Sequence, residues 1–102
     1  MSNRWFEVLD RKWVYEKKSI EFLNVETNAI IRSTHYLDDW AWVPAIEHEA
    51  GGVRRILWKG DPIKEREHAW YQTTADERKA IDIAMNRLRS FMDEIKTTGD
   101  EP

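Results

Sequence analysis

The C-terminal stretch Thr74–Lys96, TADERKAIDIAMNRLRSFMDEIK, decides the fold class of this chain. It opens with a capping box, in which the Thr74 hydroxyl accepts from the Glu77 N–H and the Glu77 carboxylate accepts from the Thr74 N–H. Apolar residues then recur at steps of three and four, which places them on one side of a helix. They are Ile81, Ala84, Met85, Leu88, Phe91, Met92 and Ile95. The stretch is therefore predicted to be an amphipathic helix with one apolar face.

A second stretch, residues 40–59, predicts a β-hairpin. Residues 40–46 (WAWVPAI) and 53–58 (VRRILW) are rich in aromatic and β-branched side chains, as strands are. Gly51 and Gly52 between them supply the positive φ angles of a tight turn. Pro44 has no N–H for a β-ladder, so we expect its strand to lie at a sheet edge or to carry a bulge there.

The first 37 residues favour strands, because Trp, Phe, Tyr, Val and Ile are frequent and Ala is scarce. Turns are expected near Asp10 and at residues 26–28. The expected strands are residues 5–9, 12–15, 19–25 and 29–33. A helix is the alternative, since several apolar residues of this region could also lie near one helical face. They are Trp5, Leu9, Trp13, Ile20 and Leu23.

The region between hairpin and helix contains Asp61 followed by Pro62, which resembles an N-cap with proline at the first helical position. A short helix over residues 61–71 is therefore predicted. Strands followed by helix indicate an α+β fold, in which a small antiparallel sheet of hairpins or a meander carries the C-terminal amphipathic helix on one face. Residues 1–96 are expected to form a single compact domain, and residues 97–102 a flexible tail.

Composition narrows the class of protein. The chain has 102 residues, of which 41% are hydrophobic and 34% charged, a mixture typical of globular domains. It has no cysteine, which excludes disulfides and thiolate chemistry and fits a reducing cytoplasm. Neither a signal peptide nor a run of about 20 apolar residues is found, so a soluble protein is expected. The net charge of −3 is spread along the chain, which argues against a nucleic-acid partner.

Six tryptophans are more than one small core is expected to enclose, so some of them should lie at the surface. Trp40 and Trp42 are two residues apart on an expected strand and so point to one face. If the helix covers the other face, they form an exposed aromatic patch that binds a partner protein, together with Trp58, Arg54 and Arg55. The alternative interpretation places these indoles in the core against the helix.

Catalytic and metal sites have weak sequence support. His35, His48 and His68 have acidic neighbours but lack the i,i+4 histidine pair of a helical zinc site, so we predict neither metal nor cofactor. No serine lies in a Gly-x-Ser-x-Gly turn, and no glycine-rich loop could cradle phosphate. Asp38 and Asp39 near His35 could supply acid/base groups. Adjacent acids are, however, more often plain turn residues.

The leading hypothesis is a non-catalytic protein that occludes or bridges a partner protein through its tryptophan-rich surface. Small cysteine-free chains with many tryptophans and mixed charge look like accessory or inhibitor proteins of bacteria and their phages. An alternative is a small ligand-binding or hydrolytic domain with a site near His35, Asp38 and Asp39. A homodimer is also possible, because four residues of the helix follow the spacing of a short coiled-coil seam. They are Ile81, Leu88, Phe91 and Ile95.

Overall fold

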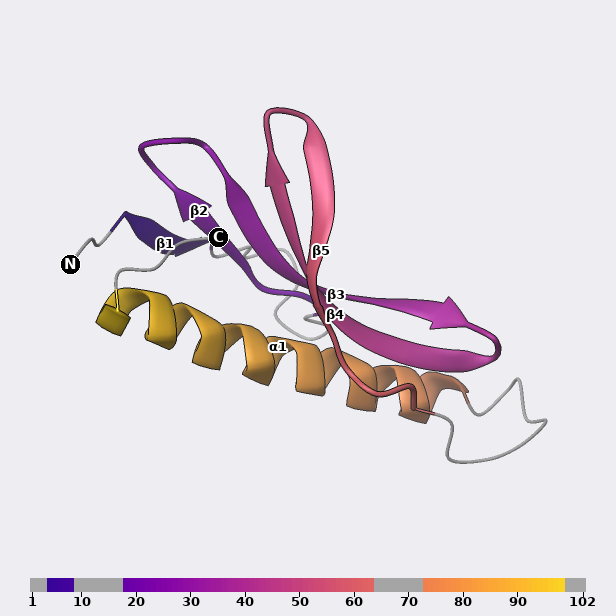
Figure 1. Ribbon diagram of the computed structural model, residues 1–102. Coiled ribbons are helices and arrows are strands. Elements are labelled where there is room, and N and C mark those ends of the chain that lie inside the picture. Colours follow the sequence, from indigo (N-terminus) through magenta and orange to yellow (C-terminus); the bar gives the residue numbers. More distant parts are fainter. Residues whose placement is uncertain (1–3, 9–17, 64–72, 99–102) are drawn as a thin grey trace.

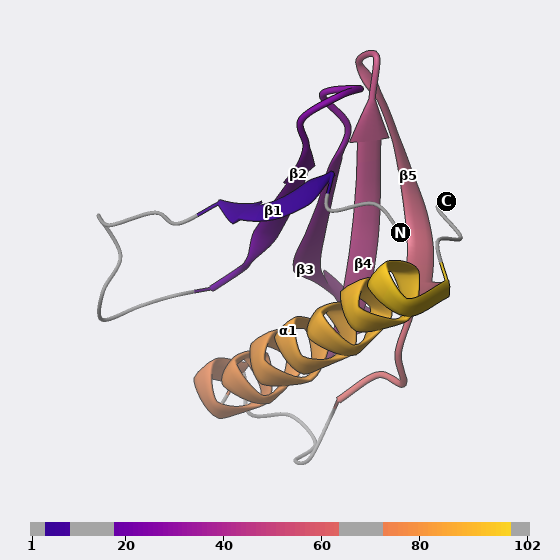
Figure 2. The same cartoon turned by 90° about the vertical axis from the view of Figure 1, so that its left-hand side faces the viewer.

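A computed structural model describes residues 4–8, 18–63 and 73–98. Its elements are β1 (Trp5–Val8), β2 (Glu21–Asn24), β3 (Ile30–Asp38), β4 (Ala41–Ala50), β5 (Val53–Lys59) and α1 (Thr73–Thr98). The strands form one antiparallel sheet in the order β1-β2-β3-β4-β5, and α1 lies across one of its faces (Figures 1 and 2). The predicted α+β fold is confirmed.

The helix extends the predicted range by a residue or two at each end. Its apolar stripe is buried as expected, with Ile81, Leu88 and Ile95 all facing the core. The stripe packs on β3 and β4, the two longest strands. Glu77 reaches across to β3, where its Oε2 lies 2.9 Å from Nε2 of His35. The Thr74 side chain, the other half of the predicted capping box, lies outside the described part of the chain.

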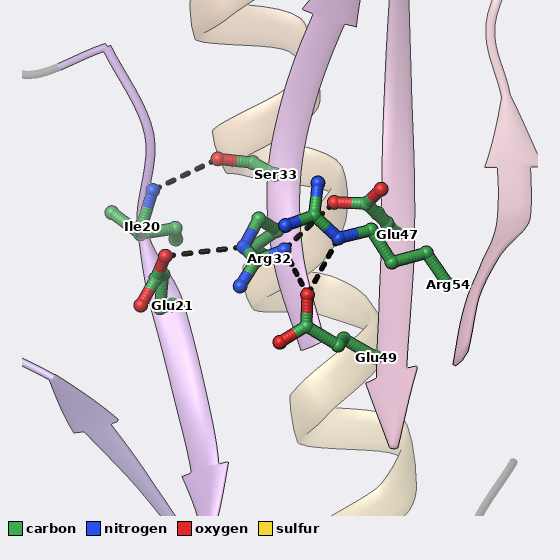
Figure 3. Close-up of polar contacts among 7 residues, drawn as sticks. All are labelled: Ile20, Glu21, Arg32, Ser33, Glu47, Glu49 and Arg54. Carbon is green, nitrogen blue, oxygen red and sulfur yellow. Dashed lines mark hydrogen bonds and ion pairs between the residues drawn. The ribbon is translucent and has the colours of Figure 1, made fainter. Parts of the chain in front are cut away.

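The face of the sheet that α1 covers is here called the inner face, and the opposite one the outer face. Strand register aligns Phe22 with Ile31, and Ser33 with Ile46, on the inner face. Ser33 is buried there, and its hydroxyl oxygen accepts from the Ile20 N–H at 2.9 Å (Figure 3). The buried apolar residues of the core come from the sheet and the helix. They are Trp5, Ile20, Phe22, Ala29, Ile31, Ile46, Ile81, Met85, Leu88, Met92 and Ile95.

The turn between β2 and β3 forms without glycine. The buried Asn24 accepts through Oδ1 from the N–H groups of Glu26 and Thr27, at 2.9 and 3.2 Å. Asn28 takes the positive φ of 62°, a conformation that asparagine tolerates better than most residues. The turn predicted at residues 26–28 is therefore confirmed. Asn28 adopts the positive φ that glycine supplies in other turns, and the Asn24 side chain satisfies two N–H groups of the turn.

The predicted hairpin of β4 and β5 is confirmed, with Gly51 and Gly52 at φ angles of 58° and 80°. The expectation for Pro44 is wrong, because β4 is an interior strand and its register shift lies between Ile46 and Glu47. The Pro44 carbonyl accepts from the Gly60 N–H, just past the end of β5. The N and C=O of a residue in an antiparallel strand point to the same side, so the Pro44 nitrogen, which has no hydrogen to donate, also points toward the residues that follow β5. The β-ladder between β4 and β5 therefore loses little.

The helix start predicted at Asp61 is also wrong. Ile63 pairs with Trp42 through two backbone hydrogen bonds of 2.8 and 3.1 Å, so residues 61–63 run alongside β4. Tertiary pairing overrides the local Asp-Pro signal here. The remainder of that expected helix, and the strand expected over residues 12–15, lie outside the described residues. In the described part, β1 pairs with β2.

Replacing Leu88 by alanine should lower the free energy of unfolding by about 2–5 kcal/mol, because the side chain is fully buried between α1 and the sheet. The matched control is Ile83→Ala on the same helix, where the side chain is exposed and the loss should stay below about 1 kcal/mol. Urea denaturation of both variants measures the difference. Equal losses would contradict the packing of this face on the sheet.

Candidate functional site

The tryptophans predicted to form one patch are separated by the fold. Trp42 shares a strand face with Pro44 and Ile46, and its ring centroid lies 5.3 Å from that of His35. Because His35 contacts Glu77 of α1, this is the inner face. The prediction that Trp42 lies on the uncovered face is therefore wrong. Its ring is half-buried beside the helix.

Trp58 also belongs to the inner face. It is in register with Ile46 and packs half-buried against the core. The Arg87 guanidinium of α1 lies 5.8 Å from its ring, a cation–π arrangement that helps to fix the indole. Trp5 is likewise buried in the core. Core packing, the alternative interpretation of the patch, therefore holds for Trp58, whereas Trp42 is half-buried beside the helix and outside the core cluster. Trp13 and Trp70 lie outside the described residues.

Trp40 differs from the other described tryptophans, because 69% of its surface is exposed. It lies in the turn between β3 and β4, where Asp39 and Trp40 have φ angles of 50° and 63°. Positive φ at both central positions defines a type I′ turn, which favours glycine at the second of them. A bulky residue in this conformation costs on the order of 1 kcal/mol or more. Trp40 therefore has a strained backbone, and its exposed indole contributes little to the core.

The β3–β4 tip is defined here as Leu37, Asp38, Asp39 and Trp40. All four side chains are exposed. The tip presents two apolar groups and two carboxylates at the end of a long ribbon, in which nine residues of β3 pair with β4. Such a surface can contact another macromolecule through the indole while the carboxylates attract cations.

Arg54 and Arg55, predicted to belong to the same surface, lie at the other end of β4. Both are exposed on β5, as the second and third residues after the Gly51-Gly52 turn. Arg54 faces the outer side, whereas Arg55 is in register with His48 of the inner face. Burial and the charge of Arg55 lower the pKa of His48. The five predicted partner-binding residues thus do not form one site.

A charged cluster on the outer face escaped the sequence analysis. Arg32 donates to Glu21 at 3.1 Å and to Glu47 at 2.8 Å, and lies 3.4 Å from Glu49, which Arg54 contacts at 2.7 Å (Figure 3). The Arg32 side chain is only 18% exposed although α1 lies on the opposite side of the strands (Figure 3). The Arg32 cluster links β2, β3, β4 and β5. Alternating charges on these strands were its only sequence signal.

The Arg32 cluster is electrostatically satisfied. Burial alone would lower the pKa of Arg32, but hydrogen bonds from its guanidinium to Glu47 and Glu21 raise it overall. The hydrogen bond from Arg54 lowers the pKa of Glu49 below its usual value, with a further contribution from Arg32. Since these groups are engaged with one another, the cluster stabilises strand register and offers no free acid or base.

The residues of the alternative hydrolytic site do not converge. His35 lies on the inner face, bonded to Glu77, whereas Asp38 lies on the outer face and Asp39 in the turn. No group of three potential metal-ligating side chains is found among the described residues. The helix residues predicted to form a homodimer seam pack within the chain itself. Ile81, Leu88 and Ile95 are buried in its core, and Phe91 packs against that core.

Comparisons with protein-family models, curated proteins and solved structures found no match to this chain. Within the described residues, no helix combines the length and the apolar character needed to span a membrane. Of the features described, the β3–β4 tip is the one that combines an exposed indole with a strained turn position.

Replacing Trp40 by glycine should raise the free energy of unfolding by about 1 kcal/mol, because glycine adopts this φ without steric cost and the indole has little burial to lose. The control is Trp58→Gly, which should destabilise the protein because Trp58 packs against the core. Thermal or urea denaturation measures both. A clear destabilisation by Trp40→Gly would mean that the indole supports the fold.

Replacing Arg54 by glutamine should raise the pKa of Glu49, because the hydrogen bond that favours the carboxylate is removed. A lowered pKa stabilises the folded chain above the ordinary carboxyl pKa, and this contribution is lost as the pH falls through the folded value. The variant should therefore lose less stability than the parent on acidification. Carboxyl NMR titration of Glu49 tests this, with Arg78→Gln on α1 as the control that should leave that pKa unchanged.

Proposed function

We propose that the chain is a non-catalytic protein-binding domain, in which Trp40 of the β3–β4 tip enters an apolar pocket of a partner protein and occludes that surface. The observation that carries the proposal is that Trp40 combines a strained backbone conformation with 69% exposure. Strained residues of this kind occur preferentially at functional sites. Tryptophan is also among the commonest hot-spot residues of protein interfaces.

The energy available from this indole is adequate for a hot spot. Most of its surface is exposed, and transfer of that surface from water is worth on the order of 3 kcal/mol before the costs of association. The tip is held by an unbroken register from Ile30–Glu49 to Asp38–Ala41. A paired ribbon loses less conformational freedom on binding than a flexible loop, which favours affinity.

The charge of the tip indicates the chemistry of the partner surface. Asp38 and Asp39 flank the indole and are both exposed. A pocket rimmed by lysine or arginine would complement them, and such rim charges chiefly accelerate association. An inhibitor or accessory protein of bacterial or phage origin that covers a basic, partly apolar surface fits this arrangement.

Trp40→Gly should abolish capture of the partner from a lysate of the source organism, with at least a tenfold loss of recovered protein, as expected for a hot-spot residue. Because glycine suits the turn, unfolding does not explain such a loss. Ile83→Ala, which removes another exposed apolar side chain, is the control and should capture as the parent does. Equal capture by parent and Trp40→Gly would exclude the tip as the binding site.

A further inference from the structure

Strand β5 ends the sheet, so one of its edges has no partner strand in the part of the chain that the structure describes. It is seven residues long, whereas the edge strand on the other side, β1, has four. The side chains from Val53 to Ile56 are all exposed, Val53 at 67% and Ile56 at 43%. A long, accessible edge strand is a template for pairing with another chain.

The register defines which backbone groups reach this edge. A two-residue turn makes the flanking pair, Ala50 and Val53, a hydrogen-bonded pair, and such pairs alternate along an antiparallel ladder. Arg54 and Ile56, in register with Glu49 and Glu47, therefore direct their N–H and C=O groups away from β4. The register shift beyond Ile56 limits this regular stretch to the part of β5 next to the turn.

The charge of β5 distinguishes the possible occupants. The strand carries Arg54, Arg55 and Lys59 and no acidic residue. A second copy of β5 would bring cations against cations, and like charges directly opposite one another destabilise a strand pair. An extended segment with acidic side chains would instead complement the edge on both faces, because Arg54 and Arg55 point to opposite sides of the sheet.

We infer that the free edge of β5 binds an extended, acidic segment of a partner protein as a sixth strand of the sheet. The main-chain groups of Arg54 and Ile56 hold the segment. Its charge is selected by the Arg55 guanidinium on one face and, on the other, by the exposed guanidinium of Arg54, which also contacts Glu49. Backbone pairing with pockets or charges for alternate side chains is a recurrent mode of peptide recognition. This surface is separate from the β3–β4 tip, so the inference does not depend on the role of Trp40.

The test uses the full chain and two synthetic octapeptides. One repeats Glu-Glu-Val-Val, which places glutamates on both faces of a strand, and the other repeats Lys-Lys-Val-Val. In ¹⁵N NMR spectra, the glutamate peptide should shift the amides of Arg54 and Ile56 and slow their hydrogen exchange. The lysine peptide should do neither. Absence of these changes with the glutamate peptide at about 1 mM, or equal changes with both peptides, would overturn the inference.

Two variants separate backbone pairing from charge. Ile56→Pro removes an N–H at the edge and should abolish binding while the spectrum of α1 remains that of the folded protein. Arg54→Gln/Arg55→Gln keeps the backbone donors and should weaken binding about tenfold, as expected for the loss of two ion pairs. Arg78→Gln/Arg89→Gln removes the same charge from α1 and is the control. If the α1 control variant binds the glutamate peptide as weakly as the β5 double variant does, then net charge, and not this edge, attracts the peptide.

Discussion

The packing of the α1 stripe on β3 and β4 is the constraint on which the other features of the molecule depend. A single helix with one apolar side can cover one face of a sheet only. The inner face therefore takes the large apolar side chains, among them Ile31 and Ile46. The outer face is stabilised differently, by the Arg32 cluster and by Lys59, whose Nζ lies 6.0 Å from the Tyr36 ring across β4. Small residues of β4 such as Ala45 are buried between β3, which carries Tyr36, and β5, which carries Lys59.

This arrangement explains which features the sequence predicted. Helical periodicity and the Gly51-Gly52 turn are local signals, and both gave the correct elements. The face of Trp42 could not be predicted, because β4 is buried on both sides, with Val43 as well as Ile46 out of solvent. Alternation assigns two residues to the same face, but it does not say which face the helix covers.

The errors at the candidate site have related causes. Composition places Trp40 on a strand, yet it lies in a turn whose geometry favours glycine, and no sequence rule predicts tryptophan there. The Arg32 cluster depends on the register of β2, β3 and β4, which the sequence alone does not define. The extended course of residues 61–63 depends on pairing with Trp42. In each case a long-range contact overrides or completes the local signal.

The two surfaces proposed for binding carry opposite charge at opposite ends of β4. Asp38 and Asp39 lie at one turn, and Arg54 and Arg55 follow the other, with ten residues of β4 between the turns. That length corresponds to about 30 Å along the strand, several times the Debye length of about 8 Å at physiological salt. The two charges therefore do not cancel one another in solution. A chain whose net charge is only −3 can thus present an acidic tip to one partner and a basic edge to another.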